Sequence, residues 1–275
     1  MQKGLIICMS LIVLGCVRTN PNDPFFIDTA TDKLLLPSNS QLHLVNNPSK
    51  VRKVTLYHNG EIFSEYGYDD GKLISRKNFG PHQSEMKYEY DEFNRIIHTE
   101  YVVESSLYRT EDFNYIWNGE GYREKHKYIN SKLESIVTEQ QHKNTYTYTE
   151  SFGNTNNETI TKLVVEGGRI IEYSLHKSKF SQEKGLYQYK KDRLVKMEYY
   201  AGSGLPLIFS FDYIYENDDL VQVFCYRHNV AVEKTIEYEQ IYEDFDANGN
   251  WKKFTQTNKD GYKEIHTREI TYITQ

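Results

Sequence analysis

The chain has 275 residues and a formal net charge of −6 at pH 7, which disfavours binding to nucleic acid through a basic patch. Hydrophobic residues make up 38% of the sequence, below the roughly 45–50% that is usual for globular domains, which argues against a deep aliphatic core. Aromatic residues make up 14%, with 24 tyrosines, and their large rings predict a thin core shared between layers.

Residues 1–15 have the pattern of a bacterial export signal. Lys3 supplies a positive start, and residues 4–14 are nearly all apolar, a run shorter than the roughly 20 residues that span a bilayer as a helix. The motif Val13-Leu14-Gly15-Cys16 resembles the lipobox of bacterial lipoproteins. This resemblance implies cleavage before Cys16 and lipid attachment to it. The alternative is an ordinary signal peptide cut elsewhere, with Cys16 incidental.

The stretch 16–50 is predicted to be a lipid-anchored tether. Val17 follows the cysteine without an acidic run, and by resemblance to lipoprotein sorting this implies an outer-membrane anchor that faces the periplasm. Prolines are dense enough here to block strand pairing. Four of the six prolines of the chain fall in this stretch: Pro21, Pro24, Pro37 and Pro48. We therefore expect a linker between the membrane and the folded domain.

Cysteine usage predicts no disulfide framework in the mature protein. Cys8 lies inside the leader, so only Cys16 and Cys225 would remain after cleavage, and a lipidated Cys16 leaves Cys225 alone. Because Cys225 lies in the apolar stretch Val223–Tyr226, we expect it to be a buried structural thiol.

Residues 51–275 are predicted to be one β-repeat domain. The unit is a Tyr-rich strand, a polar or glycine turn, a basic residue followed by Leu or Ile, and a second strand. Copies begin at Tyr68, Tyr88, Tyr187 and Tyr213, with weaker ones at Tyr128 and Val165 and a last one at Tyr242. Tyr-x-Tyr places two rings on one face of a strand, and Asp, Asn and Gly supply the positive φ that hairpin turns need.

The predicted fold is therefore an all-β antiparallel meander of repeated hairpins. A single hairpin cannot bury its own apolar face, so hairpins must stack in a solenoid-like array or extend a common, curled sheet. The segment Ser131–Gln141 is the one place where a short helix is an alternative. The alternating pattern of Glu264–Ile273 predicts a last strand that caps the sheet or pairs with a partner.

The repeat unit resembles the YD repeat, also called the RHS repeat, of bacterial envelope and secreted proteins. Tyr88–Ile96 matches the pattern Tyr-x-Tyr-Asp-x-x-Gly-Arg-Leu with Asn94 in place of Gly, and Asp244–Lys253 resembles the variant that ends in Gly-Asn-Trp. The resemblance covers about residues 51–275 irregularly, and it implies β-meander sheets that curl into shells or ribbons. Large members of the family enclose toxin domains. This chain looks more like small repeat-only lipoproteins, which have no general known activity.

Motifs for metal binding and catalysis are weak, and we predict no cofactor, no metal and no catalytic residue. Asp244-x-Asp246-x-Asn248-Gly249 matches half of a calcium loop, but its twelfth position is Thr255 instead of the required Glu, so a hairpin turn is favoured. The nine histidines show no metal-site spacing, which leaves open only a zinc site assembled from distant strands. The sequence has neither a Gly-x-Ser-x-Gly elbow nor a phosphate-binding glycine loop.

Aromatic side chains are the remaining candidates for binding. The tyrosine rows are expected to form the core, and Trp117 and Trp251 are weak candidates for an exposed binding surface. The favoured function is a non-enzymatic binding or scaffold lipoprotein of the cell envelope, whose partner is an unidentified envelope protein or glycan. The alternatives are a periplasmic immunity-type protein against a toxin, by analogy with the family, and a hydrolase of envelope polymers, suggested by the abundant carboxylates.

Overall fold

The computed structural model describes residues 48–117, 122–153, 158–167, 169–177, 181–191, 193–217, 219–229 and 232–273. The leader, Cys16 and the expected tether up to residue 47 lie outside this part. Within it, 18 strands form one antiparallel sheet, preceded by the short 3-10 helix η2 (Pro48–Lys50). No helix in these ranges is long and apolar enough to cross a membrane.

Each strand pairs with its sequence neighbours, so the all-β antiparallel meander is confirmed. The strands are β1 (Val51–His58), β2 (Glu61–Asp69), β3 (Lys72–Asn78), β4 (Ser84–Tyr90), β5 (Ile96–Val103), β6 (Ser106–Trp117), β7 (Tyr122–Ile129), β8 (Lys132–His142), β9 (Thr145–Phe152), β10 (Glu158–Glu166), β11 (Arg169–Lys177), β12 (Ser181–Lys190), β13 (Arg193–Ala201), β14 (Leu207–Glu216), β15 (Asp219–Asn229), β16 (Val232–Phe245), β17 (Trp251–Asn258) and β18 (Lys263–Tyr272). The helix alternative for Ser131–Gln141 was wrong, because this segment is strand β8.

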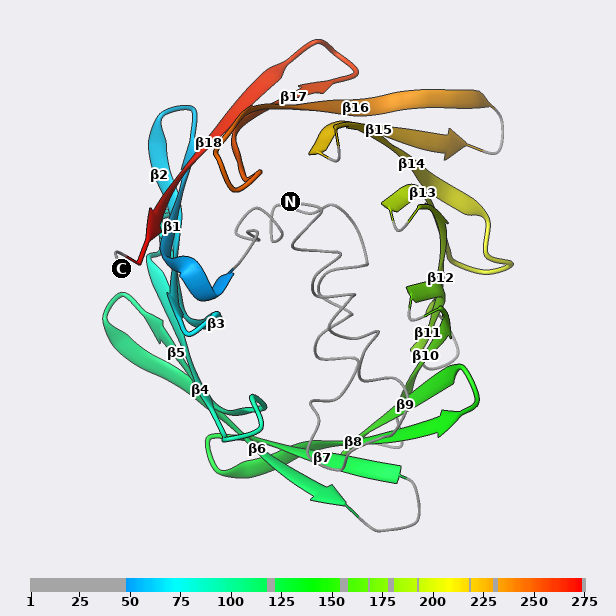
Figure 1. Ribbon diagram of the computed structural model, residues 1–275. Coiled ribbons are helices and arrows are strands. Elements are labelled where there is room, and N and C mark those ends of the chain that lie inside the picture. The colour runs from blue at the N-terminus through cyan, green and yellow to red at the C-terminus, as the bar shows by residue number, and fades with distance from the viewer. Residues whose placement is uncertain are drawn as a thin grey trace.

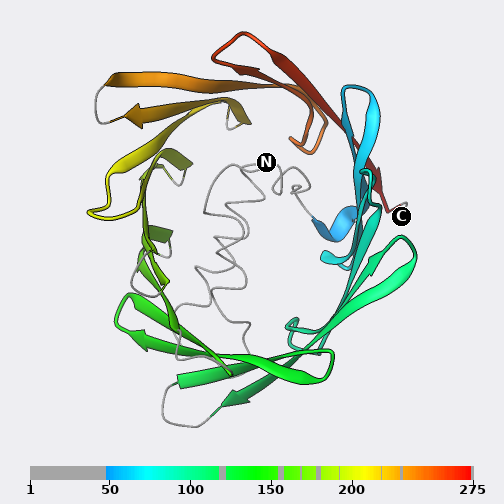
Figure 2. The ribbon, with the colours of Figure 1, turned by 180° about the vertical axis from the view of Figure 1, so that it is seen from behind.

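The sheet closes on itself into a barrel, because the last strand pairs with the first (Figures 1 and 2). The β1–β18 seam runs from Val51 opposite Tyr272 to His58 opposite His266. The sheet is therefore not a solenoid. β18 is not a free edge strand that could cap the sheet or pair with another chain, because β17 and β1 already pair with its two sides. Closure removes the unpaired edges that an open sheet would expose to aggregation.

A recurrent β-bulge helps to explain the curvature. In four hairpins the pairing register shifts just before the second tyrosine of Tyr-x-Tyr, at Tyr68, Tyr90, Tyr189 and Tyr215. A bulge bends its strand and increases the local twist. Repeating the same bulge in successive hairpins therefore bends the meander in one direction until its ends meet.

The hairpin turns use the positive-φ residues that the sequence supplies. Two-residue turns with positive φ at both positions occur at Asn59–Gly60, Asp70–Gly71 and Asn130–Ser131. These are the type I′ values that match the right-handed twist of paired strands. Turns that follow odd-numbered strands lie at one end of the barrel, called rim 1 here, and turns that follow even-numbered strands lie at the other end, rim 2.

Three longer turns share one side-chain cap. In the turn after β16, the backbone N–H groups of Asn248 and Asn250 donate to Asp246 Oδ1 at 2.8 and 3.0 Å. Asp91 after β4 and Asn258 after β17 accept the equivalent two bonds. The residue three positions on has positive φ in each case: Asn94, Gly249 and Gly261. The acidic residue of the repeat is therefore a turn-forming residue.

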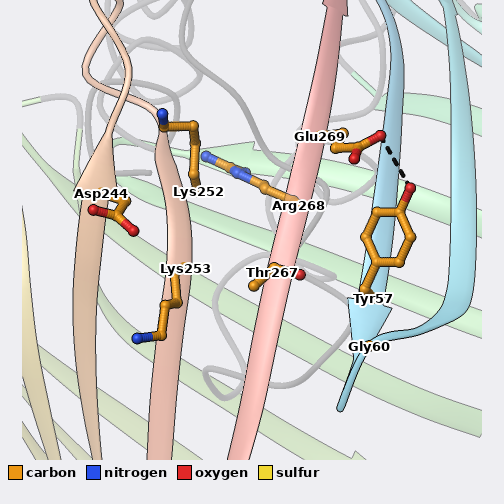
Figure 3. Close-up of a pocket in the computed structure, with 8 residues that line it drawn as sticks. All are labelled: Tyr57, Gly60, Asp244, Lys252, Lys253, Thr267, Arg268 and Glu269. Carbon is orange, nitrogen blue, oxygen red and sulfur yellow. Dashed lines mark hydrogen bonds between the residues drawn. The ribbon is translucent and has the colours of Figure 1, made fainter.

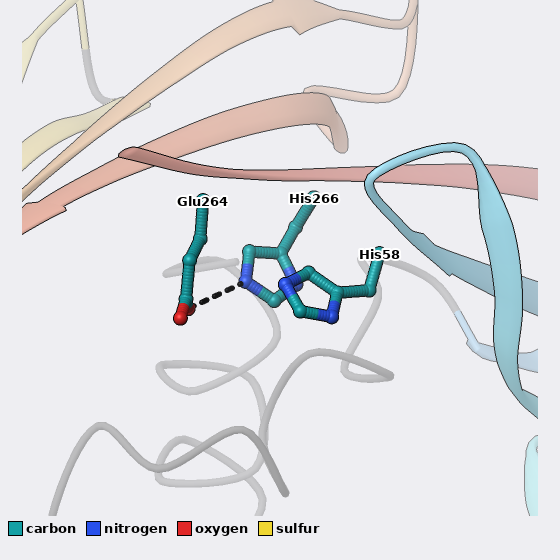
Figure 4. Close-up of side chains that lie close together, drawn as sticks. All are labelled: His58, Glu264 and His266. Carbon is teal, nitrogen blue, oxygen red and sulfur yellow. Dashed lines mark ion pairs between the residues drawn. The ribbon is translucent and has the colours of Figure 1, made fainter. Parts of the chain in front are cut away.

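The two faces of the wall differ in character. Register places Arg268, Phe254 and Tyr242 on the same face as His266, which points toward the inside of the ring (Figure 4). This inner face holds most of the buried side chains, including the tyrosines Tyr66, Tyr68, Tyr146, Tyr148, Tyr173, Tyr187 and Tyr242. The tyrosine rows therefore form the core, as expected.

The outer face carries ion pairs between neighbouring strands. Examples are Lys53–Glu65 at 2.9 Å, Lys184–Glu172 at 3.1 Å and Lys253–Glu243 at 2.9 Å. Such exposed pairs contribute about 0–1 kcal/mol each.

Candidate functional site

In three places a tyrosine joins its hairpin to the preceding one. The preceding hairpin carries a basic residue followed by an aliphatic one, and the tyrosine hydroxyl donates to the backbone oxygen of the aliphatic residue. The three bonds are Tyr90 to Leu73 at 2.8 Å, Tyr115 to Ile96 at 2.9 Å and Tyr215 to Leu194 at 2.8 Å. The basic residue stacks over the same ring: Lys72 over Tyr90, Arg95 over Tyr115 and Arg193 over Tyr215. These residues therefore have a structural role between repeats.

The seam between β1 and β18 brings together two histidines and a carboxylate on the inner face near rim 1 (Figure 4). One potential ligand atom from each of His58, Glu264 and His266 lies within 4.8 Å of the other two. The His58 and His266 rings are stacked, with centroids 4.7 Å apart and planes 12° apart. His266 is only 4% exposed. Burial, reinforced by the charge of nearby His58, lowers the pKa of His266 despite the opposing effect of Glu264.

An aromatic cluster supports this seam from β17. Phe254 stacks on His266 with ring centroids 4.4 Å apart, and Trp251 meets Phe254 edge-on at 5.3 Å. The guanidinium of Arg268 lies over the Trp251 ring at 4.0 Å, and burial lowers the pKa of Arg268 to about 9. The buried side of the seam is therefore lined by packed aromatic rings.

A shallow cavity of about 420 Å³ lies in the wall of the same region, lined mainly by outer-face residues together with Arg268 of the inner face (Figure 3). Its lining residues are Tyr57, Gly60, Asp244, Lys252, Lys253, Thr267, Arg268 and Glu269. Tyr57 donates to Glu269 at 3.0 Å, and this bond raises the pKa of the Tyr57 phenol. The mixed charges of this wall could hold a small polar ligand.

The structure places the residues singled out from the sequence in different environments. Trp251 is fully buried, at 0% exposure, so the expectation of an exposed anchor was wrong for this residue; β18 and the aromatic cluster cover it. Trp117 ends β6, but its side chain is outside the described part, as is Cys16. Asp246 caps a turn and also accepts a hydrogen bond from the Tyr272 hydroxyl, in keeping with the hairpin-turn interpretation. Cys225 is buried, and burial raises its pKa to about 12.

Sequence reasoning missed the seam cluster. The spacing Glu264-x-His266 is a signal that could have found two of its members, because residues i and i+2 share one face of a strand. The third member, His58, lies at the other end of the repeat region, and only the pairing of β1 with β18 places it beside them.

Comparison with known proteins leaves the family open. No family model matches the chain. No curated protein matches it either.

Solved structures with some likeness include a porin-like protein from Bacteroides uniformis, at 8% identity and a TM-score of 0.31, covering 80% of this chain and 96% of that one. Another is TcdB2-TccC3 without its hypervariable C-terminal region, at 11% identity and a TM-score of 0.27, covering 82% of this chain and only 16% of that one. Because these TM-scores are low, neither fold nor function is inferred from them.

Proposed function

We propose that this chain is a non-enzymatic binding or scaffold lipoprotein of the cell envelope, anchored through Cys16, that uses rim 1 of its barrel to hold a protein partner. The YD-like repeat and the lipobox-like motif support the envelope setting. The observation that carries the binding role is that the three most exposed large apolar side chains among the described residues, Tyr108, Leu107 and Tyr262, all lie near rim 1.

Five consecutive hairpins around the ring expose large apolar side chains near rim 1. They are Tyr262 and Ile265 in β17–β18, Ile62 in β1–β2, Phe79 after β3, Leu107 and Tyr108 in β5–β6, and Leu133 in β7–β8. Tyr108 and Leu107 are the most exposed, at 68% and 61%. Strongly exposed apolar side chains that follow one another along a rim mark an interaction surface, and tyrosine is enriched among the residues that dominate protein interfaces.

The ends of the barrel strands fit this arrangement. Val51, where β1 begins, and Tyr272, where β18 ends, both lie at rim 2. A chain that leads from a lipidated Cys16 into β1 therefore joins the barrel at the end opposite Tyr108, Leu107 and Tyr262. This leaves rim 1 to face away from the point of attachment. Other exposed apolar side chains, such as Phe93, Ile97 and Ile116, lie near rim 2.

Crosslinking in the native envelope tests the proposal. The lipidated protein is compared with a Cys16→Ala variant, with a double rim variant Leu107→Ser and Tyr108→Ser, and with Ile116→Ser as a control, because Ile116 is an exposed apolar residue on the same strand near rim 2. We expect one dominant protein partner that is lost in the Cys16 and rim variants and kept in the control. Equal capture by all variants, or no protein partner, would contradict the proposal.

The two alternatives lead to different results in the same experiment. Co-purification of polysaccharide instead of protein favours glycan binding or hydrolysis, and the outer cavity beside Asp244 and Glu269 would then be the first place to mutate. Capture of a toxin would favour the immunity-type role.

A further inference from the structure

A second site lies at the seam, and its side chains have the chemistry of a metal centre. His58, Glu264 and His266 offer two imidazole nitrogens and one carboxylate oxygen. Two histidines and one acidic residue form a common protein ligand set for Zn²⁺, which then keeps a fourth position for water or another ligand. Hard cations such as Mg²⁺ and Ca²⁺ prefer oxygen donors, so this set favours a transition metal.

The distances are close to those that coordination requires. Zinc bonds of about 2.0–2.1 Å in tetrahedral geometry place donor atoms roughly 3.4 Å apart. Glu264 Oε2 already lies 3.6 Å from His266 Nε2. The stacked rings of His58 and His266 must turn out of parallel for their lone pairs to converge. His58 is half-buried and makes a long 3.4 Å contact with Asn59, so its ring is the one that can rotate.

A weakly paired buried nitrogen gives further support. Among the described residues, His266 Nε2 makes a long 3.6 Å ion-pair contact with Glu264 but no hydrogen bond, although its side chain is almost fully buried. A buried polar atom that lacks a close partner is destabilising, and a metal ion would satisfy it.

The surrounding residues hold the buried ligand in place. Phe254 stacks on His266 with planes 8° apart, which fixes the orientation of that ring from β17. Cross-strand pairing places the backbone of His58 opposite that of His266. The His266 donor is therefore held before any ion binds, and the His58 ring has only to rotate toward it.

We propose that His58, Glu264 and His266 form a Zn²⁺ site that ties the first strand of the barrel to the last. The site joins β1 to β18 at the one junction of neighbouring strands that no hairpin turn connects. An ion there would cross-link two strands that are far apart in the sequence. Because a cross-link that closes a long loop removes more conformational entropy from the unfolded chain, it would stabilise the folded barrel.

Metal titration of the full-length protein, purified without a histidine tag and stripped with EDTA, tests the site. Zn²⁺ is added in competition with a chromophoric chelator, and Co²⁺ absorption reports the coordination geometry. We expect one equivalent of Zn²⁺ to bind at micromolar concentration or tighter, with a tetrahedral Co²⁺ spectrum. His58→Ala and Glu264→Gln should each weaken binding at least tenfold, and the increase in thermal midpoint on adding Zn²⁺ should disappear.

A matched control separates the site from general histidine binding. His126 pairs with the carboxylate of Glu124 at 2.9 Å on the outer face, so His126→Ala removes a comparable His–Glu pair away from the seam and should leave binding unchanged. His58 is partly exposed, so His58→Ala should fold, and circular dichroism checks this. Failure of the wild-type protein to bind one equivalent below 100 μM, or equal loss in His126→Ala and His58→Ala, would overturn the proposal without affecting the proposed role of rim 1.

Discussion

At the scale of single residues, the repeat motif is explained by contacts between hairpins. The second tyrosine places its ring under a basic side chain and its hydroxyl on the backbone of the preceding hairpin, as Tyr215 does with Arg193 and Leu194. The aromatic ring fills the core while the hydroxyl satisfies a carbonyl at its edge. This dual role explains why tyrosine, and not phenylalanine, dominates the composition.

Tyr215→Phe tests the hydroxyl contribution. The variant keeps the ring and removes the donor to the Leu194 carbonyl, so we expect the free energy of unfolding to fall by about 0.5–1.5 kcal/mol. Chemical denaturation measures the change. Tyr108→Phe is the control, because Tyr108 is 68% exposed, and its effect should be close to zero. Similar values for the two variants would argue against the inter-hairpin role.

At the scale of the element, the acidic residue of the repeat forms turns instead of carrying chemistry. Asp91, Asp246 and Asn258 cap equivalent turns with the same pair of backbone bonds. The chain itself therefore shows that an amide can replace the carboxylate in this cap, because both offer an accepting oxygen.

Substitution of Asp246 separates the cap from the charge. Asp246→Ala removes both backbone bonds and the bond from Tyr272, and we expect a loss of about 1–3 kcal/mol in the free energy of unfolding. Asp246→Asn keeps an acceptor as Asn258 does, and should cost less than half as much. Equilibrium unfolding in urea distinguishes the two, and equal losses would show that the charge is what matters.

The same residue predicts a dependence of stability on acid pH. Burial opposes ionisation of Asp246, but bonds from Tyr272, Asn250 and Asn248 outweigh it, so the pKa lies below its ordinary value of 3.8. A lowered folded-state pKa gives stability that is complete above 3.8 and is lost as the pH falls through the folded value. Thermal midpoints measured from pH 6 down to pH 3 should therefore fall less in Asp246→Asn than in the wild type. Parallel curves would contradict this.

At the scale of the whole molecule, closure of the sheet is the decisive feature. At the seam, Val54 and Leu56 of β1 are buried, and Arg268 of β18 lies over the Trp251 ring. Most of the buried tyrosines lie on the inner face, and cross-strand ion pairs such as Lys53–Glu65 lie on the outer face. The seam also creates both the metal-ligand cluster and the outer cavity.

A disulfide across the seam tests closure in solution. Lys53 and Thr271 are exposed register partners on β1 and β18, and opposed strand positions lie within the Cα separation of about 4.4–6.8 Å that a disulfide accepts. A K53C/T271C variant in a Cys8→Ser, Cys16→Ser background should form an intramolecular cross-link on mild oxidation, seen as faster migration in a non-reducing gel. The control pair K53C/K132C spans β1 and β8, which lie seven strands apart in the ring, and should not cross-link. Cross-linking in both or in neither would contradict the closed seam.

The local features of this protein follow from its sequence alone. Alternating aromatic residues, positive-φ turn residues and basic–aliphatic pairs each act within one hairpin or between two, so they predict the meander and its tyrosine core. The candidate sites could not be predicted in the same way. Trp251 was expected to be exposed, but it is fully buried. Glu264 and His266 are close in sequence, whereas the third possible metal ligand, His58, joins them only in the folded barrel.

Closure was decided by the tertiary structure. A similar hairpin unit can build a solenoid, an open ribbon or a barrel, because these differ only in small increments of twist and bend at each strand. Those increments accumulate over 18 strands until β18 meets β1. The meeting joins residues at opposite ends of the repeat region, and no local pattern specifies it; it is set by the sum of the bulges and by the burial gained when the last edge is paired.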